Sequence, residues 1–227
     1  MATQADQPSE VYEAPAVRAV RELYTGLIDE RAWNRPPLLQ LRLQAARLSD
    51  GHRDKRPGAL TELANWHPWL AAQSAEIIWA AALTDQDFLA TVAREHGYSD
   101  WSAVTADTDS IPSRQFESTV EALLAGDLAA VTAALAADPT LVTARSHWPH
   151  RATLLHYLGA NGVETHRQRV PANAVAIAEL LLSHGADVRA TATMYGGPHT
   201  TVDLLLTSSH PAQAGVADAL AQALATG

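Results

Sequence analysis

Apolar residues recur along this chain at steps of three and four, and almost nowhere at steps of two. The apolar residues of the first such run share one face of an ideal helix: Val17, Val20, Leu23, Tyr24 and Leu27. Alternation of apolar and polar residues over four or more positions, which is typical of half-buried strands, is nearly absent. No Asn-Gly or Asp-Gly pair joins two strand-like runs. The pattern therefore predicts an all-α protein built from short helices.

Prolines, glycines and charged clusters separate these helices. In the first half we expect helices at residues 17–32, 38–48, 59–66, 75–83 and 85–96. Pro36 and Pro37 end the first of them and can open the second. A charged segment, SDGHRDKRPG at residues 49–58, is expected to be a loop. Residues 1–15 are polar and unpatterned, so we expect a loose N-terminal tail.

Composition excludes several classes of protein. Of the 227 residues, 47% are hydrophobic and 18% are charged, which is enough apolar material for a sizeable core and excludes a wholly disordered chain. The formal net charge of −9 argues against nucleic acid as a partner, because binding phosphates requires clustered Lys and Arg. There is no cysteine, which excludes disulfides, thiolate nucleophiles and Cys-ligated metals.

The sequence contains neither a recognisable targeting or membrane-spanning segment nor a known cofactor-binding motif. The N-terminus lacks the basic and apolar regions of a secretory signal, and the most apolar stretch, residues 77–83, is far shorter than the ~20 residues that span a bilayer. We therefore expect a cytoplasmic protein with no membrane partner. No phosphate-binding loop, dinucleotide fingerprint, HExxH or GxSxG motif is present, and we expect no cofactor and no metal.

Two segments of the second half are more specific. Residues 153–162 read TLLHYLGANG, and residues 174–188 read AVAIAELLLSHGADV. They resemble the two helices of an ankyrin repeat, whose first helix carries a Thr-Pro-Leu-His signature; Leu154 stands in place of the Pro. In this resemblance Thr153 and His156 bond backbone groups, the leucines pack between stacked repeats, and Gly185 ends the second helix. The resemblance implies a divergent bacterial ankyrin-like protein with a solenoid of stacked helix pairs.

Weaker units surround this one. Residues 116–144 have the same cadence, with a turn at Gly126 and Asp127, and a degraded unit covers residues 200–207 and 216–224. Residues 84–104 look like the helix-plus-Trp lead-in of some bacterial ankyrin proteins. We therefore divide the chain into the tail, an N-terminal helical region with degenerate repeat-like helix pairs at residues 16–110, and ankyrin-like repeats at residues 111–227.

This sequence departs from a plain repeat by insertions. Gly185 lies 32 residues after Thr153, where an ordinary unit of ~33 residues places them about 21 apart. The excess equals residues 163–173, VETHRQRVPAN, and a second insertion, SSHPAQAG, covers residues 208–215. A third unusual segment, MYGGPHTT, covers residues 194–201. Inserts of successive solenoid units emerge on related faces, so we expect these three segments to meet in one polar pocket.

The pocket hypothesis assigns roles to particular side chains. His156 or His210 is the candidate acid or base, and Tyr195 is the candidate hydrogen-bond donor. Arg167 is the candidate anchor for a carboxylate or phosphate. The other candidate ligand-binding residues are Asn161, Glu164, Gln168, Asn173, Thr200 and Thr207.

Each assignment has a structural alternative. His156 is a structural residue in an ordinary ankyrin repeat, and the charged insertion is equally consistent with a solvated loop. His147 and His150 have HxxH spacing, but Pro149 prevents the helix that would align their rings on a metal. Trp66, Trp69 and Trp79 are expected in the core or between helices.

Two functions remain open. The first is an ankyrin-like binding protein that presents a concave, partly polar surface to a protein or small-molecule partner. The second is an isomerase, cyclase or hydrolase that acts by acid–base catalysis on a biosynthetic metabolite. A homodimer is also possible, because a short solenoid can expose an apolar end that a second copy covers.

Overall fold

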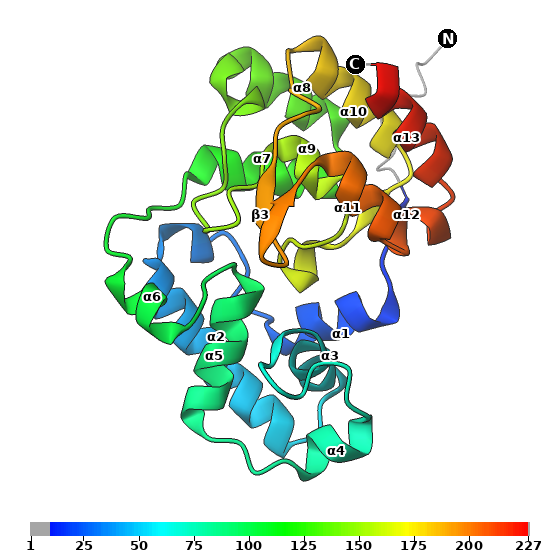
Figure 1. Cartoon of the computed structure of the whole chain (residues 1–227). Coiled ribbons are helices and arrows are strands. Elements are labelled where there is room, and N and C mark those ends of the chain that lie inside the picture. The colour runs from blue at the N-terminus through cyan, green and yellow to red at the C-terminus, as the bar shows by residue number, and fades with distance from the viewer. Residues whose placement is uncertain (1–9, 227) are drawn as a thin grey trace.

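The chain is mostly helical, as its periodicity predicts. The computed structural model describes residues 10–226, and in Figure 1 the N-terminal half lies below the C-terminal half. Residues 1–9, which belong to the expected tail, lie outside the described residues. No helix among residues 10–226 is both long and apolar enough to cross a membrane.

The N-terminal half surrounds its own apolar core. Its helices are α1 (Pro15–Leu23), η1 (Ala32–Asn34), α2 (Pro37–Arg53), α3 (Pro57–Trp66), α4 (Ala75–Ala80), α5 (Asp85–Glu95) and α6 (Trp101–Ala106). Val17, Val20, Leu23 and Tyr24 are all buried, which confirms the apolar face read from the sequence. α1 packs on α3, and α2 packs on α5.

The ends of α1 and α2 differ most from the sequence prediction. α1 ends at Leu23 rather than near residue 32, because the chain turns at Gly26, which has φ +79°. α2 continues to Arg53, through residues expected to form a loop. Gly51 is buried there, and a Cβ atom at this position would lie 2.6 Å from Leu23 Cδ1. A tertiary contact at Gly51 therefore keeps this polar stretch helical.

The C-terminal half contains successive helix pairs, of which α7 and α8 are joined by a short turn and the later pairs by longer connections. Its helices are α7 (Arg114–Leu124), α8 (Leu128–Ala137), η2 (Pro139–Val142), α9 (Leu154–Tyr157), η3 (Thr165–Arg167), α10 (Ala174–Ser183), α11 (Thr201–Thr207), α12 (His210–Gln213) and α13 (Ala217–Thr226). α7 contacts α9, which contacts α11; α8 contacts α10, which contacts α13. Gly185 has φ +93° just after α10, as the resemblance implies.

Residues 10–226 also contain two pairs of short strands, which the helical periodicity did not predict. β1 (Val11–Tyr12) pairs antiparallel with β2 (Val170–Pro171), so part of the expected loose tail is a strand bound to the insertion. β3 (Ala192–Met194) and β4 (Gly197–His199) form an antiparallel hairpin with its turn at Tyr195 and Gly196. Strands of two or three residues are too short to give a period-two signal.

Side chains of each half pack into the core of the other half. Tyr12, at the N-terminal end, packs against the core of the C-terminal half. Trp148, from the C-terminal half, is buried in the core of the N-terminal half. Because each half completes the core of the other, the boundary between them is a packed interface.

Candidate functional site

The insertion at residues 163–173 runs into this interface. Glu164, Thr165, His166 and Arg167 are all buried, where the sequence suggested an exposed polar loop or a ligand-binding wall. Thr165 N–H donates to Glu95 Oε1 at 2.9 Å, and Trp66 Nε1–H donates to Thr165 Oγ1 at 2.9 Å. Trp66 and Glu95 belong to α3 and α5, so these bonds fix the insertion to the N-terminal half.

Arg167 is the centre of a buried charge cluster, here called the Arg167 network. Its Nη2 lies 2.6 Å from Glu117 Oε2, its Nη1 3.0 Å from Glu164 Oε1 and its Nε 3.1 Å from Glu121 Oε1. Arg169 completes the network by donating to Glu121 Oε2 at 2.7 Å. The fixed fork of a guanidinium suits it to several carboxylates at once.

The electrostatics of the Arg167 network follow from this geometry. Burial alone would raise the pKa of Glu117, but the charge of Arg167 and a hydrogen bond from His147 outweigh it and lower that pKa to about 2. Burial disfavours the charge of Arg167, yet its three carboxylate partners raise its pKa well above the ordinary value. The ionised state is therefore maintained by mutual pairing in a site with little water.

Histidines line the same region. His147 Nδ1 lies 3.2 Å from Glu117 Oε1, and His150 Nε2 lies 3.8 Å from Glu164 Oε2. Burial, and then nearby positive charge, lower the pKa of His150 well below its usual range. Trp148 contacts the rings of both His96 and His147, at centroid distances of 4.4 and 4.1 Å.

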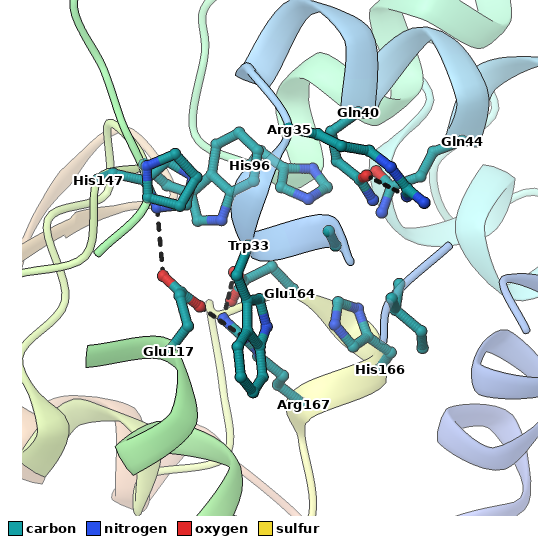
Figure 2. Close-up of a pocket in the computed structure, with 14 residues that line it drawn as sticks. Trp33, Arg35, Gln40, Gln44, His96, Glu117, His147, Glu164, His166 and Arg167 are labelled. Atoms are coloured by element: carbon teal, nitrogen blue, oxygen red, sulfur yellow. Dashed lines mark hydrogen bonds and ion pairs between the residues drawn. The ribbon is translucent and has the colours of Figure 1, made fainter. Parts of the chain in front are cut away.

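The space beside these groups is small. Figure 2 shows Glu117, Glu164 and Arg167 on one side of a cavity, with His96 and His147 on the other. Its volume is about 30 Å³, which suffices for one or two water molecules. No group of three or more His, Asp or Glu among residues 10–226 is arranged to hold a metal ion. The arrangement can hold and exchange protons, but a substrate does not fit beside it.

A carboxyl pair lies deeper in the interface. Glu62 and Glu95 are both buried, and Tyr24 Oη donates to Glu62 Oε2 at 3.4 Å. Burial, and then the charge of Glu95 and a hydrogen bond with it, raise the pKa of Glu62 well above its usual range. Burial beside a second acid therefore favours the protonated form of Glu62.

Glu62→Gln is expected to flatten the dependence of stability on pH. In unfolded chains the pKa of Glu is about 4.3, and in the fold that of Glu62 is higher, so between these values the folded state holds the extra proton. The free energy of unfolding then falls as pH rises through this window, by up to about 1.4 kcal/mol per pH unit. The amide of the variant cannot lose a proton. In urea unfolding, the free energy of unfolding of the variant should therefore increase relative to that of the wild type between pH 5 and pH 8. Glu76→Gln, at an exposed position, is the control; equal pH dependence of wild type and Glu62→Gln would contradict the raised pKa of Glu62.

A larger hollow, the Tyr195 groove, opens elsewhere along the interface. It lies between the β3–β4 hairpin and the ends of α3 and α5, and its volume is about 550 Å³. Trp66, Tyr98, Met194 and Tyr195 supply its apolar surface, and Arg94 lies on its N-terminal wall. Hollows of this size are typical of ligand sites.

Tyr195 is held over the groove at a cost in backbone energy. It has φ +52°, in the left-handed region that disfavours side chains larger than glycine, and it is 61% exposed. Its ring is parallel to that of Trp66, with centroids 6.1 Å apart and planes at 4°. Its hydroxyl donates to Asn161 Oδ1 at 2.5 Å, and Asn161 Nδ2 donates to Thr207 Oγ1 at 2.9 Å.

The structure divides the candidate residues among separate places. Asn161, Tyr195 and Thr207 lie together at the groove, whereas Glu164 and Arg167 line the 30 Å³ cavity. The expectation of one common pocket is therefore wrong. The three inserted segments attach to different parts of the interior, because the first one is anchored by carboxylates of α7.

His156 has the structural role that the ankyrin resemblance implies. Its Nδ1 accepts hydrogen bonds from the backbone N–H and hydroxyl of Thr153, at 3.2 and 2.8 Å, and its Nε2 lies 3.3 Å from the carbonyl oxygen of His199. Burial lowers its pKa to about 4, so the ring is neutral at pH 7. Both nitrogens are occupied, which leaves none for a ligand.

The remaining candidates support the backbone or lie apart. Gln168 donates to the carbonyl of Val163 and Asn173 to that of Gly126, at 2.9 and 2.8 Å. Thr200 caps α11 through Asp203. His210 packs beside Tyr12, with ring centroids 6.5 Å apart, instead of beside His156.

Several residues of these sites escaped the sequence analysis. Glu62, Glu95 and Glu117 each lie on the buried face of a helix among mostly apolar residues, and a carboxylate on that face is the signal that could have identified them. His147 and His150 were considered only as a metal pair, and Trp66 only as a packing residue. Comparisons of the chain with protein-family models, with curated proteins and with solved structures each gave no match.

Proposed function

We propose that this chain is a binding protein of ankyrin-like architecture, and that the Tyr195 groove receives an extended segment of a protein partner. The observation that carries the proposal is Tyr195 itself. It is largely exposed, is strained in its backbone, and is held over a hollow by Asn161. The two-residue turn of the β3–β4 hairpin itself requires a positive φ at this position, which Gly or Asn adopts at less cost, so a tyrosine here indicates a use for its side chain.

The arrangement of helices supports the architecture. The pairs α7–α8, α9–α10 and α11–α13 follow one another, with first helices in contact with first helices and second with second. That is the order expected of stacked repeat units. The insertion at residues 163–173 departs from a plain repeat, and its inward side chains bind the stack to the N-terminal half.

The chemistry of the groove favours an aromatic residue with an acidic neighbour in the partner. Trp66 and Tyr195 offer ring faces, and Met194 offers a polarisable floor. Arg94 is exposed at the rim, and no hydrogen bond or ion pair of its side chain occurs among residues 10–226. Its guanidinium is free to pair with a carboxylate of the partner.

Binding accounts for these observations better than catalysis. The groups suited to acid–base chemistry, Glu117, His147 and Arg167, surround a cavity that admits only water. The Tyr195 groove, which is large enough for a ligand, presents mainly aromatic rings and an exposed guanidinium; Glu95 and His150 also line it, but both are buried. We therefore favour binding over catalysis for this site.

Selection of random peptides displayed on phage tests the proposal. We expect enriched peptides to contain an aromatic residue beside Asp or Glu, and to bind Tyr195→Ala at least about tenfold more weakly than wild type. Trp69→Ala is the matched control, because Trp69 is 57% exposed outside the groove and its loss should leave affinity unchanged. The proposal fails if no peptide is enriched, or if the enriched peptides bind Tyr195→Ala as well as wild type.

A further inference from the structure

A third hollow shares no lining residue with the Tyr195 groove. It is bounded by α1, by the turn at Thr25 and Gly26 and by residues of the insertion, and its volume is about 400 Å³. We infer that it binds a small ligand through an oxyanion group, either a phosphate or a carboxylate. The inference does not depend on the Tyr195 groove, since none of the residues it uses lines that groove.

Its walls carry arginines from two distant segments. Arg18 and Arg21 come from α1, and Arg169 comes from the insertion. Arg18 and Arg21 share one carboxylate, Glu13, at 3.6 and 2.7 Å, and their side chains are 64% and 41% exposed. They can therefore reorient toward a ligand while keeping the fold.

Two buried polar atoms at this hollow have no partner among the residues that the structure describes. Arg169 uses Nη2 on Glu121, and its Nε has no hydrogen bond. His166 is 7% exposed, and its Nδ1 also has no hydrogen bond. A buried donor without an acceptor costs free energy, and a ligand oxygen would remove that cost at Arg169.

The acidic residues nearby do not favour a cation in place of an anion. Glu121 has one oxygen bonded to Arg167 and the other to Arg169, so it is already neutralised. Glu22 and Asp29 also line the hollow, but both are exposed to solvent at its rim. Burial, followed by the charges of Arg167, His96, Arg169 and Arg21, lowers the pKa of His166, so His166 has positively charged neighbours. The unpaired N–H of Arg169 and the two arginines of α1 are donors, which suit an oxyanion.

Titration with inorganic phosphate and, separately, with acetate tests this inference at constant ionic strength. We expect the Nε–Hε resonance of Arg169 in ¹⁵N NMR spectra to move saturably with at least one anion. Tighter binding of phosphate than of acetate would assign the ligand group to phosphate, and the reverse would assign it to carboxylate. Constant ionic strength is required because surface arginines respond to salt alone.

Two variants distinguish specific binding of the anion at this hollow from nonspecific attraction to surface charge. Arg21→Ala should weaken the anion about tenfold, as loss of a charge-assisted hydrogen bond does, with the fold retained because Arg21 is at the surface. Arg53→Ala removes the same charge from an exposed pair with Asp50 and should have no effect. The inference is overturned if the Arg169 resonance does not saturate with either anion, or if Arg21→Ala binds as tightly as Arg53→Ala.

Discussion

Arg167→Met is expected to lower the free energy of unfolding by about 3–5 kcal/mol, the usual cost of removing one partner from a buried ion pair. The side chain of Arg167 is 5% exposed and that of its partner Glu117 is 2% exposed, so the substitution leaves buried carboxylates without a counter-charge. Methionine retains most of the apolar volume, which confines the effect to charge. Urea unfolding at pH 7 measures the loss.

Two further variants identify its cause. Arg53→Met removes an arginine whose side chain is 68% exposed and should leave stability nearly unchanged. Adding Glu117→Gln and Glu164→Gln to Arg167→Met should restore part of the lost stability, because these two buried carboxylates then no longer lack a counter-charge. The account of the Arg167 network would be contradicted if Arg167→Met were as stable as the wild type. It would also be contradicted if the triple variant were less stable than Arg167→Met alone.

The same network sets the behaviour of the protein in acid. The folded-state pKa of Glu117 is about 2, below the unfolded value of about 4.3. A depressed pKa contributes stability that is complete above the unfolded value and is lost as pH falls toward 2. Arg167→Met removes this contribution, so the variant should lose less stability than the wild type between pH 5 and pH 3.

Gly58→Ala is expected to destabilise the protein by about 3 kcal/mol, the upper part of the range for inserting a methyl group into a packed interior. A Cβ atom at Gly58 would lie 2.3 Å from the carbonyl oxygen of Ala19 and 2.9 Å from Leu23 Cβ. The first of these is backbone of α1, so relief requires α1 and α3 to separate. Alanine gains at most about 1 kcal/mol in helix propensity over glycine, which is too little to compensate.

Gly197→Ala is the matched control for this substitution. Its nearest neighbour would be His199 Nε2, at an ordinary contact distance of 3.8 Å, and its φ is not positive. Thermal unfolding should therefore show a large fall in Tm for Gly58→Ala and little change for Gly197→Ala. Equal Tm values for the two variants would mean that α1 and α3 do not approach as closely as described.

The helices that were predicted well are those with local signals. α7 and α8 follow from apolar periodicity, and Asp127 caps α8 with a side-chain bond to Ala130 N–H directly after Gly126. The extension of α2 through Gly51 could not be predicted in this way. It depends on contact with Leu23, and no local signal distinguishes that glycine from a loop glycine.

The sequence identified charged residues of the candidate site but not the direction in which their side chains point. The sequence identified Glu164 and Arg167 as a charged group in an insertion, and the structure places both in a polar cavity. Their orientation depends on Glu117 and Glu121, which lie more than forty residues earlier in the chain. Pairing over such a separation leaves no periodic pattern in the sequence. The sequence therefore suggested a ligand-binding surface, whereas in the structure Arg167 forms buried ion pairs with Glu164 and with Glu117 of α7.

We propose that the Tyr195 groove, and not the Arg167 network, contacts the partner. The most direct measurement is NMR mapping of a peptide selected on the wild-type protein. The account predicts that the indole N–H of Trp66 and the backbone N–H of Gly196 shift on saturation, while the Nε–Hε resonance of Arg167 does not. Shifts concentrated at Arg167 and His147, with Trp66 and Gly196 unmoved, would contradict it.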